Sequence, residues 1–283
     1  MNSPDAALAT SDGLRLHLQR WTAPDPARGT LLIVHGLGEH IGRYARVATQ
    51  LNAWGWHVAG HDHRGHGRSE GRRGAIPTED ALLRDLAQVI DAVRESAPGP
   101  LVLLGHSMGG LVAARFVVEG LQPQPAPWHR AVDALMLSSP ALDLGMNAAQ
   151  KLLLAVLGPI APALAVSNGL KPEWISRDPA VVAAYVADPL VHDRVTPRLV
   201  RFMLEGGKVA RAGAARWSVP TLLLWAGSDR CVAPTGSAAF AAAAPQQVLQ
   251  ANCFEPLFHE IFHEPEKAEV FAALGSWLAA RGH

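Results

Sequence analysis

A serine flanked by glycines carries the strongest chemical signature in this sequence. The run Gly105-His106-Ser107-Met108-Gly109 fits the pattern G-x-S-x-G, in which the serine is the nucleophile of an acyl transfer. Such a serine sits on a sharp turn between a strand and a helix, and small residues beside it let neighbouring backbone approach. An apolar run at 101–104 precedes it, and a run with helical spacing at 110–116 follows. The context therefore favours a nucleophile over a bystander serine in a glycine-rich turn.

A serine hydroxyl needs a base to take its proton, and the base needs an acid to orient it. In folds that carry this turn, the acid follows the serine along the chain and the histidine comes last. Asp229 follows an apolar run, and His259 precedes a final stretch with helical spacing. Asp133 and Asp143 rank below Asp229, because they lie near another strand or outside the strand pattern. We therefore predict Ser107 as nucleophile, Asp229 as acid and His259 as base.

Acyl transfer also needs two backbone donors for the oxyanion that forms at the carbonyl. One should be the N–H of Met108, the residue after the nucleophile. The other should be the N–H of Leu37, in the loop after the apolar run 30–34. Gly36 and Gly38 flank Leu37 and let the backbone turn toward a substrate. A plain glycine turn is the alternative, because side chains cannot prove a backbone role.

Two histidine patterns resemble metal sites. The run 259–263 spells H-E-x-x-H, in which two histidines one helical turn apart bind zinc. That motif needs a helix through all five residues and a third ligand, whereas Pro265 disfavours helical geometry at Glu264. The run 61–66 resembles H-x-H-x-D-H, but Gly65 stands where the acidic ligand should be. We therefore predict no metal and no cofactor, and we rank a zinc hydrolase far below a serine enzyme.

The elements that must position these residues alternate between strand and helix patterns. Continuously apolar runs, typical of strands buried on both faces, occur at 30–34, 56–59, 101–104, 134–137 and 221–225. The run 14–18 alternates like a half-exposed strand. Stretches with helical spacing lie at 43–54, 78–96, 110–120, 236–243 and 265–280. This alternation predicts an α/β fold with a mostly parallel sheet, and catalytic groups on loops at the carboxyl ends of its strands.

The stretch 143–216 interrupts this alternation. It has proline and glycine punctuation and no convincing strand run, which predicts a helical cap inserted between two parts of a core, residues 1–142 and 217–283. Within it, the apolar run 151–166 is too short and too broken by proline to span a membrane. It can pack over the core as a cap helix or present a surface that docks on lipid, and the two interpretations are compatible.

Composition narrows the class of substrate and partner. The 25 Lys and Arg residues balance 25 Asp and Glu residues, so no basic field points to nucleic acid and a small, largely uncharged substrate is expected. The first residues lack the charged and apolar regions of a signal peptide, which predicts a cytoplasmic protein. Cys231 and Cys253 are too few for a disulfide framework. Cys231 follows Asp229 by two residues; we expect a structural thiol, and whether it affects activity stays open.

Several of these motifs occur together in one group of enzymes. From about residue 14 onward the chain resembles the monoacylglycerol lipase and lysophospholipase group of α/β-hydrolases, which is also grouped with serine aminopeptidase-like sequences. The motifs are HGLGEH with RY at 35–44, DHRGHGRSEG at 62–71, GHSMGG at 105–110, DPLV at 188–191, GSD at 227–229 and HE at 259–260. The resemblance implies the α/β-hydrolase fold, a helical cap and a triad of Ser107, Asp229 and His259. His263 departs from it, because this group more often has asparagine there.

The leading prediction is hydrolysis of a medium- or long-chain acylglycerol or lysophospholipid through an acyl-enzyme, with the cap in transient, peripheral contact with a membrane or micelle. A carboxylesterase for soluble short esters would differ only in the cap, and a binding protein of the same fold would show no turnover. Glu39 and Arg43 lie four residues apart at the start of a predicted helix, and therefore on one face of it. They form either a surface ion pair or a pair that positions a polar head such as glycerol.

Overall fold

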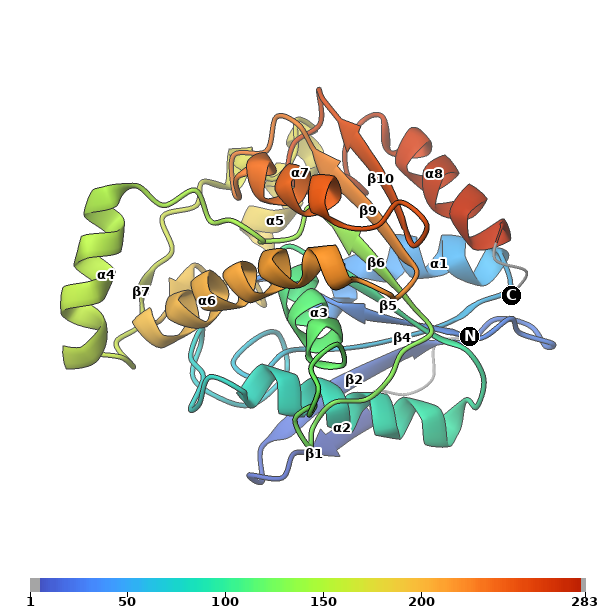
Figure 1. Cartoon of the computed structure of the whole chain (residues 1–283), viewed down its shortest axis with the longest axis horizontal. Coiled ribbons are helices and arrows are strands. Elements are labelled where there is room, and N and C mark those ends of the chain that lie inside the picture. The colour runs from blue at the N-terminus through green and yellow to red at the C-terminus, as the bar shows by residue number, and fades with distance from the viewer. Residues whose placement is uncertain (1–5, 281–283) are drawn as a thin grey trace.

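An eight-stranded sheet with helices on both faces forms the centre of the computed structural model, which describes residues 6–280 (Figure 1). The strand order is β1-β2-β4-β3-β5-β6-β9-β10, and neighbours from β4 to β10 run parallel. The strands are β1 (Ala6–Ala9), β2 (Arg15–Trp21), β3 (Thr30–Val34), β4 (His57–His61), β5 (Leu101–His106), β6 (Ala134–Ser138), β9 (Thr221–Ala226) and β10 (Leu249–Phe254). This mostly parallel sheet confirms the predicted fold class.

Helices cover both faces because each central strand is apolar on both sides. Leu31 and Ile33 of β3 pack toward α1 and α8, whereas Leu32 and Val34 pack toward α2, α3, α6 and α7. The flanking helices are α1 (Ala45–Ala53), α2 (Ala81–Ser96), α3 (Met108–Glu119), α6 (Pro197–Gly213), α7 (Pro234–Ala243) and α8 (Lys267–Ala279), with the 3-10 turn η1 (Ile41–Tyr44) before α1. Side chains that alternate between two cores fix the register of each strand, since a slip by one residue would exchange the faces.

The predicted strands and helices are present, but the sequence patterns missed both edges of the sheet. Strand β1 pairs only with β2, and β10 pairs only with β9. The side chains of β10 are mostly exposed, so its sequence LQANCF lacks the apolar run that marks a central strand. Edge strands depend on backbone pairing to one neighbour, and hydropathy does not record that pairing.

Between β6 and β9 the chain leaves the sheet. This segment contains α4 (Ala148–Ile160), β7 (Val166–Ser167), η2 (Pro172–Trp174), α5 (Pro179–Ala187), β8 (Arg194–Val195), the flanking helix α6 and η3 (Ala214–Arg216). The short strands β7 and β8 pair with each other, a feature that the sequence patterns did not indicate.

Helix α4 shows that one interpretation of the apolar run 151–166 is wrong. The helix packs against α6 and projects away from the sheet, so it does not cover the core (Figure 1). Leu152, Leu153 and Ile160 are 66%, 58% and 76% exposed. Several of its apolar residues therefore lie at the surface. Among the described residues, no helix is long and apolar enough to cross a membrane.

Candidate active site

Ser107 lies on a strained turn between β5 and α3. Its φ of 54° and ψ of −122° are unusual for a residue other than glycine and cost about 1–3 kcal/mol. The turn is tight, because a Cβ on Gly109 would lie 2.0 Å from the carbonyl oxygen of Val34. The backbone of Ser107 is held by the N–H that it donates to Ser138 O at 3.0 Å and by the N–H that it accepts from Ala141 at 2.9 Å. Neighbouring strands therefore fix the serine in place.

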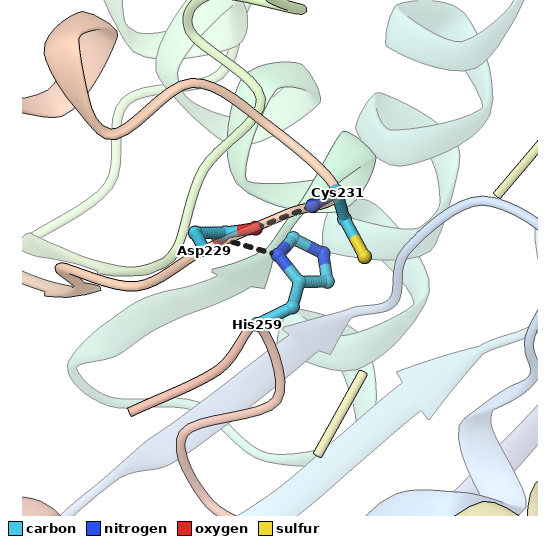
Figure 2. A group of neighbouring side chains, drawn as sticks. All are labelled: Asp229, Cys231 and His259. Atoms are coloured by element: carbon cyan, nitrogen blue, oxygen red, sulfur yellow. Dashed lines mark hydrogen bonds and ion pairs between the residues drawn. The ribbon is translucent and has the colours of Figure 1, made fainter. Parts of the chain in front are cut away.

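Asp229 and His259 form a buried pair at the carboxyl ends of β9 and β10. Nδ1 of His259 lies 2.7 Å from Oδ2 of Asp229 (Figure 2). The other carboxylate oxygen, Oδ1, accepts the backbone N–H of Cys231 at 2.8 Å and that of Val232 at 3.1 Å. Burial opposes protonation of His259, but the Asp229 carboxylate outweighs burial and the pKa of His259 is raised. The pair therefore holds the ring in one orientation and makes it more basic.

The structure brings most of the predicted site residues to one cavity of about 350 Å³. Ser107, His259, Leu37 and Glu39 all line it. Asp229 lies behind His259, and Arg43 lies outside the lining residues. Helix α3 begins at Met108, so the N–H of this residue has no acceptor within the helix. The N–H of Met108 is therefore a candidate donor to an oxyanion, and Leu37, the other predicted donor, lines both the first cavity and the second one described below.

A second cavity, of about 390 Å³, meets the first at Ser107. Leu37, Asn168, Leu170 and Cys231 line both cavities. The first cavity is lined by polar groups that include Glu39, Lys171, Tyr185, Asp188, His192 and Glu260. The second is lined mostly by apolar groups that include Met108, Leu144, Trp174, Val195, Val200 and Met203. The serine thus lies where a cavity with many charged side chains in its wall meets one whose wall is made mostly of apolar side chains.

Arg43 holds together the loops that carry the oxyanion candidate and the base. Its guanidinium donates to Glu39 at 2.9 Å and to both carboxylate oxygens of Glu260 at 2.6 and 2.8 Å. Glu39 in turn accepts the N–H of Gly36 at 2.6 Å and the hydroxyl of Tyr44 at 2.7 Å. Burial opposes ionisation of Glu260, but Arg43 lowers its pKa. All three charged side chains are nearly buried, so the interpretation as a surface ion pair is wrong.

Sequence analysis missed the role of Glu260. Glu260 occurs there in the false zinc motif and in the HE pair at 259–260, but 217 residues separate it from Arg43, so no local pattern links the two. The segment between β6 and β9 adds a further contact, because the centre of the Tyr185 ring lies 4.8 Å from the guanidinium carbon of Arg43. A buried arginine with two acidic partners is typical of a positioning residue.

Replacing Arg43 by methionine should lower the free energy of unfolding by about 3 kcal/mol. The change leaves the carboxylates of Glu39 and Glu260 buried without their counter-charge, and removing one partner of a buried pair is strongly destabilising. Urea unfolding monitored by circular dichroism measures the loss. Arg46→Met is the matched control, because Arg46 is exposed on the adjacent helix α1. Equal stability of the two variants would contradict a structural role for the network.

The H-E-x-x-H run is not a zinc helix. Residues 259–263 form a turn, and the ring of His263 faces Glu260 at 3.1 Å. Glu260 is engaged by Arg43, and His259 is engaged by Asp229. Because the segment is not helical, the two histidines do not have the spacing of that motif. The prediction that this run is a false motif is thus supported by its geometry.

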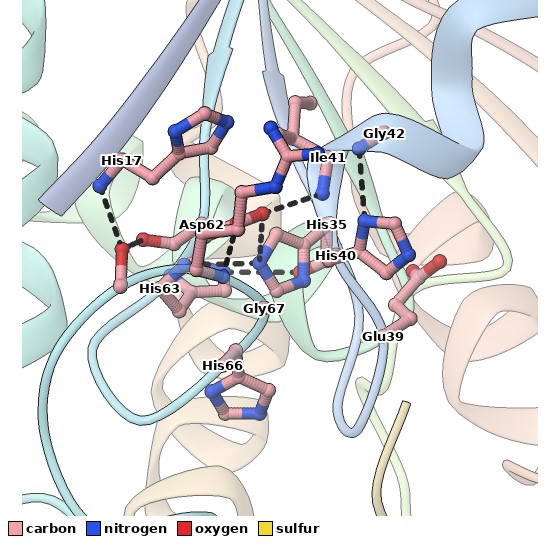
Figure 3. A network of polar contacts seen from close by, with 12 residues as sticks. His17, His35, Glu39, His40, Ile41, Gly42, Asp62, His63, His66 and Gly67 are labelled. Atoms are coloured by element: carbon pink, nitrogen blue, oxygen red, sulfur yellow. Dashed lines mark hydrogen bonds and ion pairs between the residues drawn. The ribbon is translucent and has the colours of Figure 1, made fainter. Parts of the chain in front are cut away.

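The second histidine pattern belongs to a buried cluster that also includes His35, in the loop after β3 (Figure 3). The backbone N–H of His63 donates to Nε2 of His35 at 2.9 Å, and Nε2 of His63 donates to the backbone carbonyl oxygen of His35 at 3.0 Å. Asp62 accepts the backbone N–H groups of Ile41 at 2.7 Å and Arg68 at 2.7 Å, and so ties two loops together. These contacts tie the loops around the site to one another.

Acid should destabilise the protein through this histidine cluster. Burial lowers the pKa of His61 to about 4 and that of His63 to about 3, whereas an unfolded histidine titrates near 6.5. Below pH 6.5 the unfolded state therefore binds more protons, and stability falls as pH falls. Between pH 6 and pH 5 each of these histidines should remove about 1 kcal/mol from the free energy of unfolding. Urea titrations at both pH values measure this.

His61→Leu provides the control for that prediction, because neither ring nitrogen of His61 has a hydrogen-bond partner among the described residues. The variant should lose part of the pH dependence while remaining folded. If the free energy of unfolding changed with pH as steeply as in the unmodified protein, other groups would cause the acid sensitivity.

Burial also explains the state of Cys231. Burial and the nearby Asp229 carboxylate raise the pKa of its thiol, which agrees with the structural thiol that we expect. The structure also shows how close it lies to the pair, since its Sγ is within 4.8 Å of ligand atoms of Asp229 and His259. Cys253 is exposed on β10 and lies on the edge of the sheet.

Comparison with known proteins agrees with this geometry. A sequence model of the family described as "Serine aminopeptidase, S33" matches residues 25–266. The chain is 32% identical over 272 residues to a monoacylglycerol lipase of Mycolicibacterium smegmatis, covering 95% of this chain and 94% of that protein. It is 32% identical over 256 residues to a phospholipase of Bacillus subtilis, covering 89% and 95% of the two chains. The crystal structure of a monoacylglycerol lipase from Paleococcus ferrophilus superposes with a TM-score of 0.81 at 34% identity, covering 94% and 98%.

These matches extend over nearly the whole chain and include both the sheet and the inserted helices. The relatives carry names of lipid ester hydrolases, and the fold of the solved lipase is the fold described above. The chain therefore belongs to the serine aminopeptidase S33 family, and it is a serine ester hydrolase with the α/β-hydrolase fold, of the type to which the monoacylglycerol lipases belong.

Proposed function

We propose that this enzyme hydrolyses monoacylglycerols, with Ser107 as the nucleophile. The observation that carries the proposal is the meeting at Ser107 of one cavity with many polar and charged side chains in its wall and another whose wall side chains are mostly apolar. A monoacylglycerol has the same division, with a glycerol head on one side of its ester and an acyl chain on the other. Both volumes lie in the range of about 300–1,000 Å³ that is usual for small-molecule sites. A lysophospholipid is the second candidate, because it also carries a single acyl chain. Its polar head is larger than glycerol.

In the proposed mechanism, His259 takes the proton of Ser107 as the serine oxygen attacks the ester carbonyl. The N–H groups of Leu37 and Met108 hold the oxyanion. His259 then gives the proton to the departing glycerol, and an acyl-enzyme remains on Ser107. Water enters, loses a proton to the same histidine and releases the fatty acid. Asp229 keeps the ring oriented and stabilises its charged form.

Glu39 is the residue that we assign to the glycerol head. It lines the polar cavity, and its carboxylate is held by Gly36, Tyr44 and Arg43. Arg43 acts through Glu39, because its own guanidinium lies outside the cavity lining. A fixed carboxylate beside the ester can accept a hydroxyl of glycerol, and a simple alkyl ester offers no such hydroxyl.

Chain-length selectivity tests the proposal. The purified enzyme should hydrolyse long-chain monoacylglycerol faster, in kcat/KM, than di- or triacylglycerol, and p-nitrophenyl esters of graded length should show a rise with acyl chain length. Lysophospholipid is assayed in parallel. Selectivity for the shortest soluble esters would instead identify a general carboxylesterase, and no turnover of any ester would identify a binding protein.

We further propose that residues 143–216 form a cap over a core made of residues 1–142 and 217–283, and that this cap contacts lipid. Supporting this, exposed apolar side chains gather on α4 and the loop after it, at Leu152, Leu153, Val156, Ile160 and Leu164. Monoacylglycerols reside in membranes and micelles, so an enzyme that cleaves them must approach a lipid surface. An exposed apolar helix face is the usual means of such contact.

The double variant Leu153→Glu/Val156→Glu tests this contact. It should lower the rate on monoacylglycerol held in vesicles by about 10-fold or more. Each added carboxylate would have to enter the lipid interface, which costs up to about 3 kcal/mol in binding free energy. The rate on a soluble short ester should not change, since neither residue lines the two cavities at Ser107. Vesicle co-sedimentation gives a second readout, and equal loss on both substrates would contradict the role.

A further inference from the structure

Three potential metal ligands of different chemistry converge beside the proposed nucleophile. Asp229, Cys231 and His259 each offer one ligand atom, and these atoms all lie within 4.8 Å of one another (Figure 2). Within residues 6–280, this is the group of histidine, cysteine and acidic side chains that comes together in this way. A carboxylate, a thiol and an imidazole are all zinc ligands in proteins. The proposed mechanism uses Asp229 and His259 and gives no role to Cys231.

The turn after β9 places the thiol of Cys231 beside Asp229 and His259. Oδ1 of Asp229 accepts the backbone N–H of Cys231 at 2.8 Å, which folds the chain back over the carboxylate. Cys231 lines both cavities that meet at Ser107, so a small solute that enters either of them can reach its sulfur. Its position is fixed by the same hydrogen bonds that fix the catalytic acid.

The imidazole is also oriented as a metal ligand would be. Oδ2 of Asp229 holds Nδ1 of His259 at 2.7 Å, which leaves Nε2 as the free nitrogen. Histidines that bind zinc commonly donate their other N–H to a carboxylate in the same manner. Figure 2 shows the sulfur of Cys231 beside the half of the ring that carries Nε2, away from Asp229.

One ligand atom of each residue lies within 4.8 Å of the others, and the ligand atoms would have to come closer together to share one ion. Zinc binds imidazole nitrogen at about 2.0–2.1 Å and thiolate sulfur at about 2.3 Å, so its N and S ligands lie roughly 3.5 Å apart in a tetrahedral site. Rotation of the Cys231 side chain about its Cα–Cβ bond moves its sulfur relative to the ring. Two ligands come from the protein, and water completes the coordination.

We propose that Cys231 and His259 bind a zinc ion that switches the esterase off, with Asp229 as the supporting carboxylate. This inference rests on the proposed roles of Ser107 and His259. On binding, the thiol of Cys231 releases its proton to water and the lone pair of Nε2 enters the bond to zinc. His259 then cannot accept the proton of Ser107. Inhibition should compete with substrate, because the ion occupies the point where the two cavities meet.

Inhibition by zinc provides the first test. Micromolar Zn²⁺ should inhibit ester hydrolysis, and a chelator should restore it. In Cys231→Ser the inhibitory concentration should rise at least 10-fold, measured against that variant's own activity without zinc. Cys253→Ser is the matched control, because it removes the exposed thiol on β10 and should leave the inhibition unchanged. The proposal would be overturned if zinc inhibited both variants equally, or if it did not inhibit the unmodified enzyme.

Metal binding itself provides the second test and does not depend on turnover. Co²⁺ replaces zinc and gives a thiolate-to-cobalt absorption band when sulfur is a ligand. The band should appear in the Ser107→Ala protein and disappear in Ser107→Ala/Cys231→Ser, while Ser107→Ala/Cys253→Ser keeps it. A band that persists without Cys231 refutes the site. If the protein cleaves no ester but shows the band, the metal site stands and the proposed function fails.

Discussion

Replacement of Ser107 by alanine is expected to lower kcat for ester hydrolysis by about 10⁴- to 10⁶-fold, the range seen when the nucleophile of a serine hydrolase is removed. The variant keeps the cavities, the backbone donors and His259, but it has no oxygen that can form the acyl-enzyme. Pre-steady-state assays with a p-nitrophenyl ester should therefore show no burst of nitrophenol. Thermal unfolding should be unchanged, because alanine accepts the same backbone strain as serine.

The strain at this position gives the experiment a control of its own. Glycine adopts a φ of 54° without the cost that a side chain brings. Ser107→Gly should thus be as inactive as the alanine variant but more stable, by about 1 kcal/mol. A folded Ser107→Ala protein with substantial activity would remove Ser107 from the mechanism, and a less stable glycine variant would contradict the strained turn.

The second large effect is expected for Asp229→Asn, which should lower kcat by about 10⁴-fold. The reason lies in the backbone around the carboxylate. The N–H groups of Cys231 and Val232 both point at Oδ1 and will hold the amide oxygen of asparagine there. The amide nitrogen then faces Nδ1 of His259, which must become an acceptor. The ring proton moves to Nε2, and the base can no longer accept the proton of Ser107.

The pH profile separates this explanation from simple unfolding. In the unmodified enzyme the pKa of His259 is raised, so kcat/KM should fall as pH decreases through a midpoint above 6.5. Without the Asp229 carboxylate, burial dominates and the midpoint of the residual activity should move to lower pH. Asp143→Asn is the matched control, since Asp143 lies outside both cavities and was a weaker candidate for the acid. Loss of activity in that variant would reassign the acid.

Arg43 and Cys231 lie on different sides of the site formed by Ser107, Asp229 and His259. Arg43 supports the loops of Gly36 and His259 from behind, through Glu39 and Glu260. Cys231 lies in front, on the side of the cavities. The Arg43 network thus supports the loop of His259 on one side, and the proposed zinc ion would bind His259 together with Cys231 on the side of the cavities.

Some expectations from sequence were wrong for a common reason. The run 151–166 was expected to cover the core or dock on lipid, and its helix α4 does not cover the core. Strand β10 was not expected, because its exposed side chains lack an apolar pattern. In each case hydropathy was a poor guide, since it records the composition of a segment and not the neighbour that the segment meets.

The sequence alone predicted the chemistry at Ser107 and the order of the elements around it. That was possible because a strand, a tight glycine turn and a helix are local features, governed by backbone sterics and short-range hydropathy. Only the tertiary structure decided which distant groups meet there. Glu260 reaches Arg43 across 217 residues, and Cys231 reaches the ring of His259 from another strand end. Such contacts depend on how parallel strands bring their carboxyl ends to one edge, and a linear pattern cannot specify which side chains then face each other.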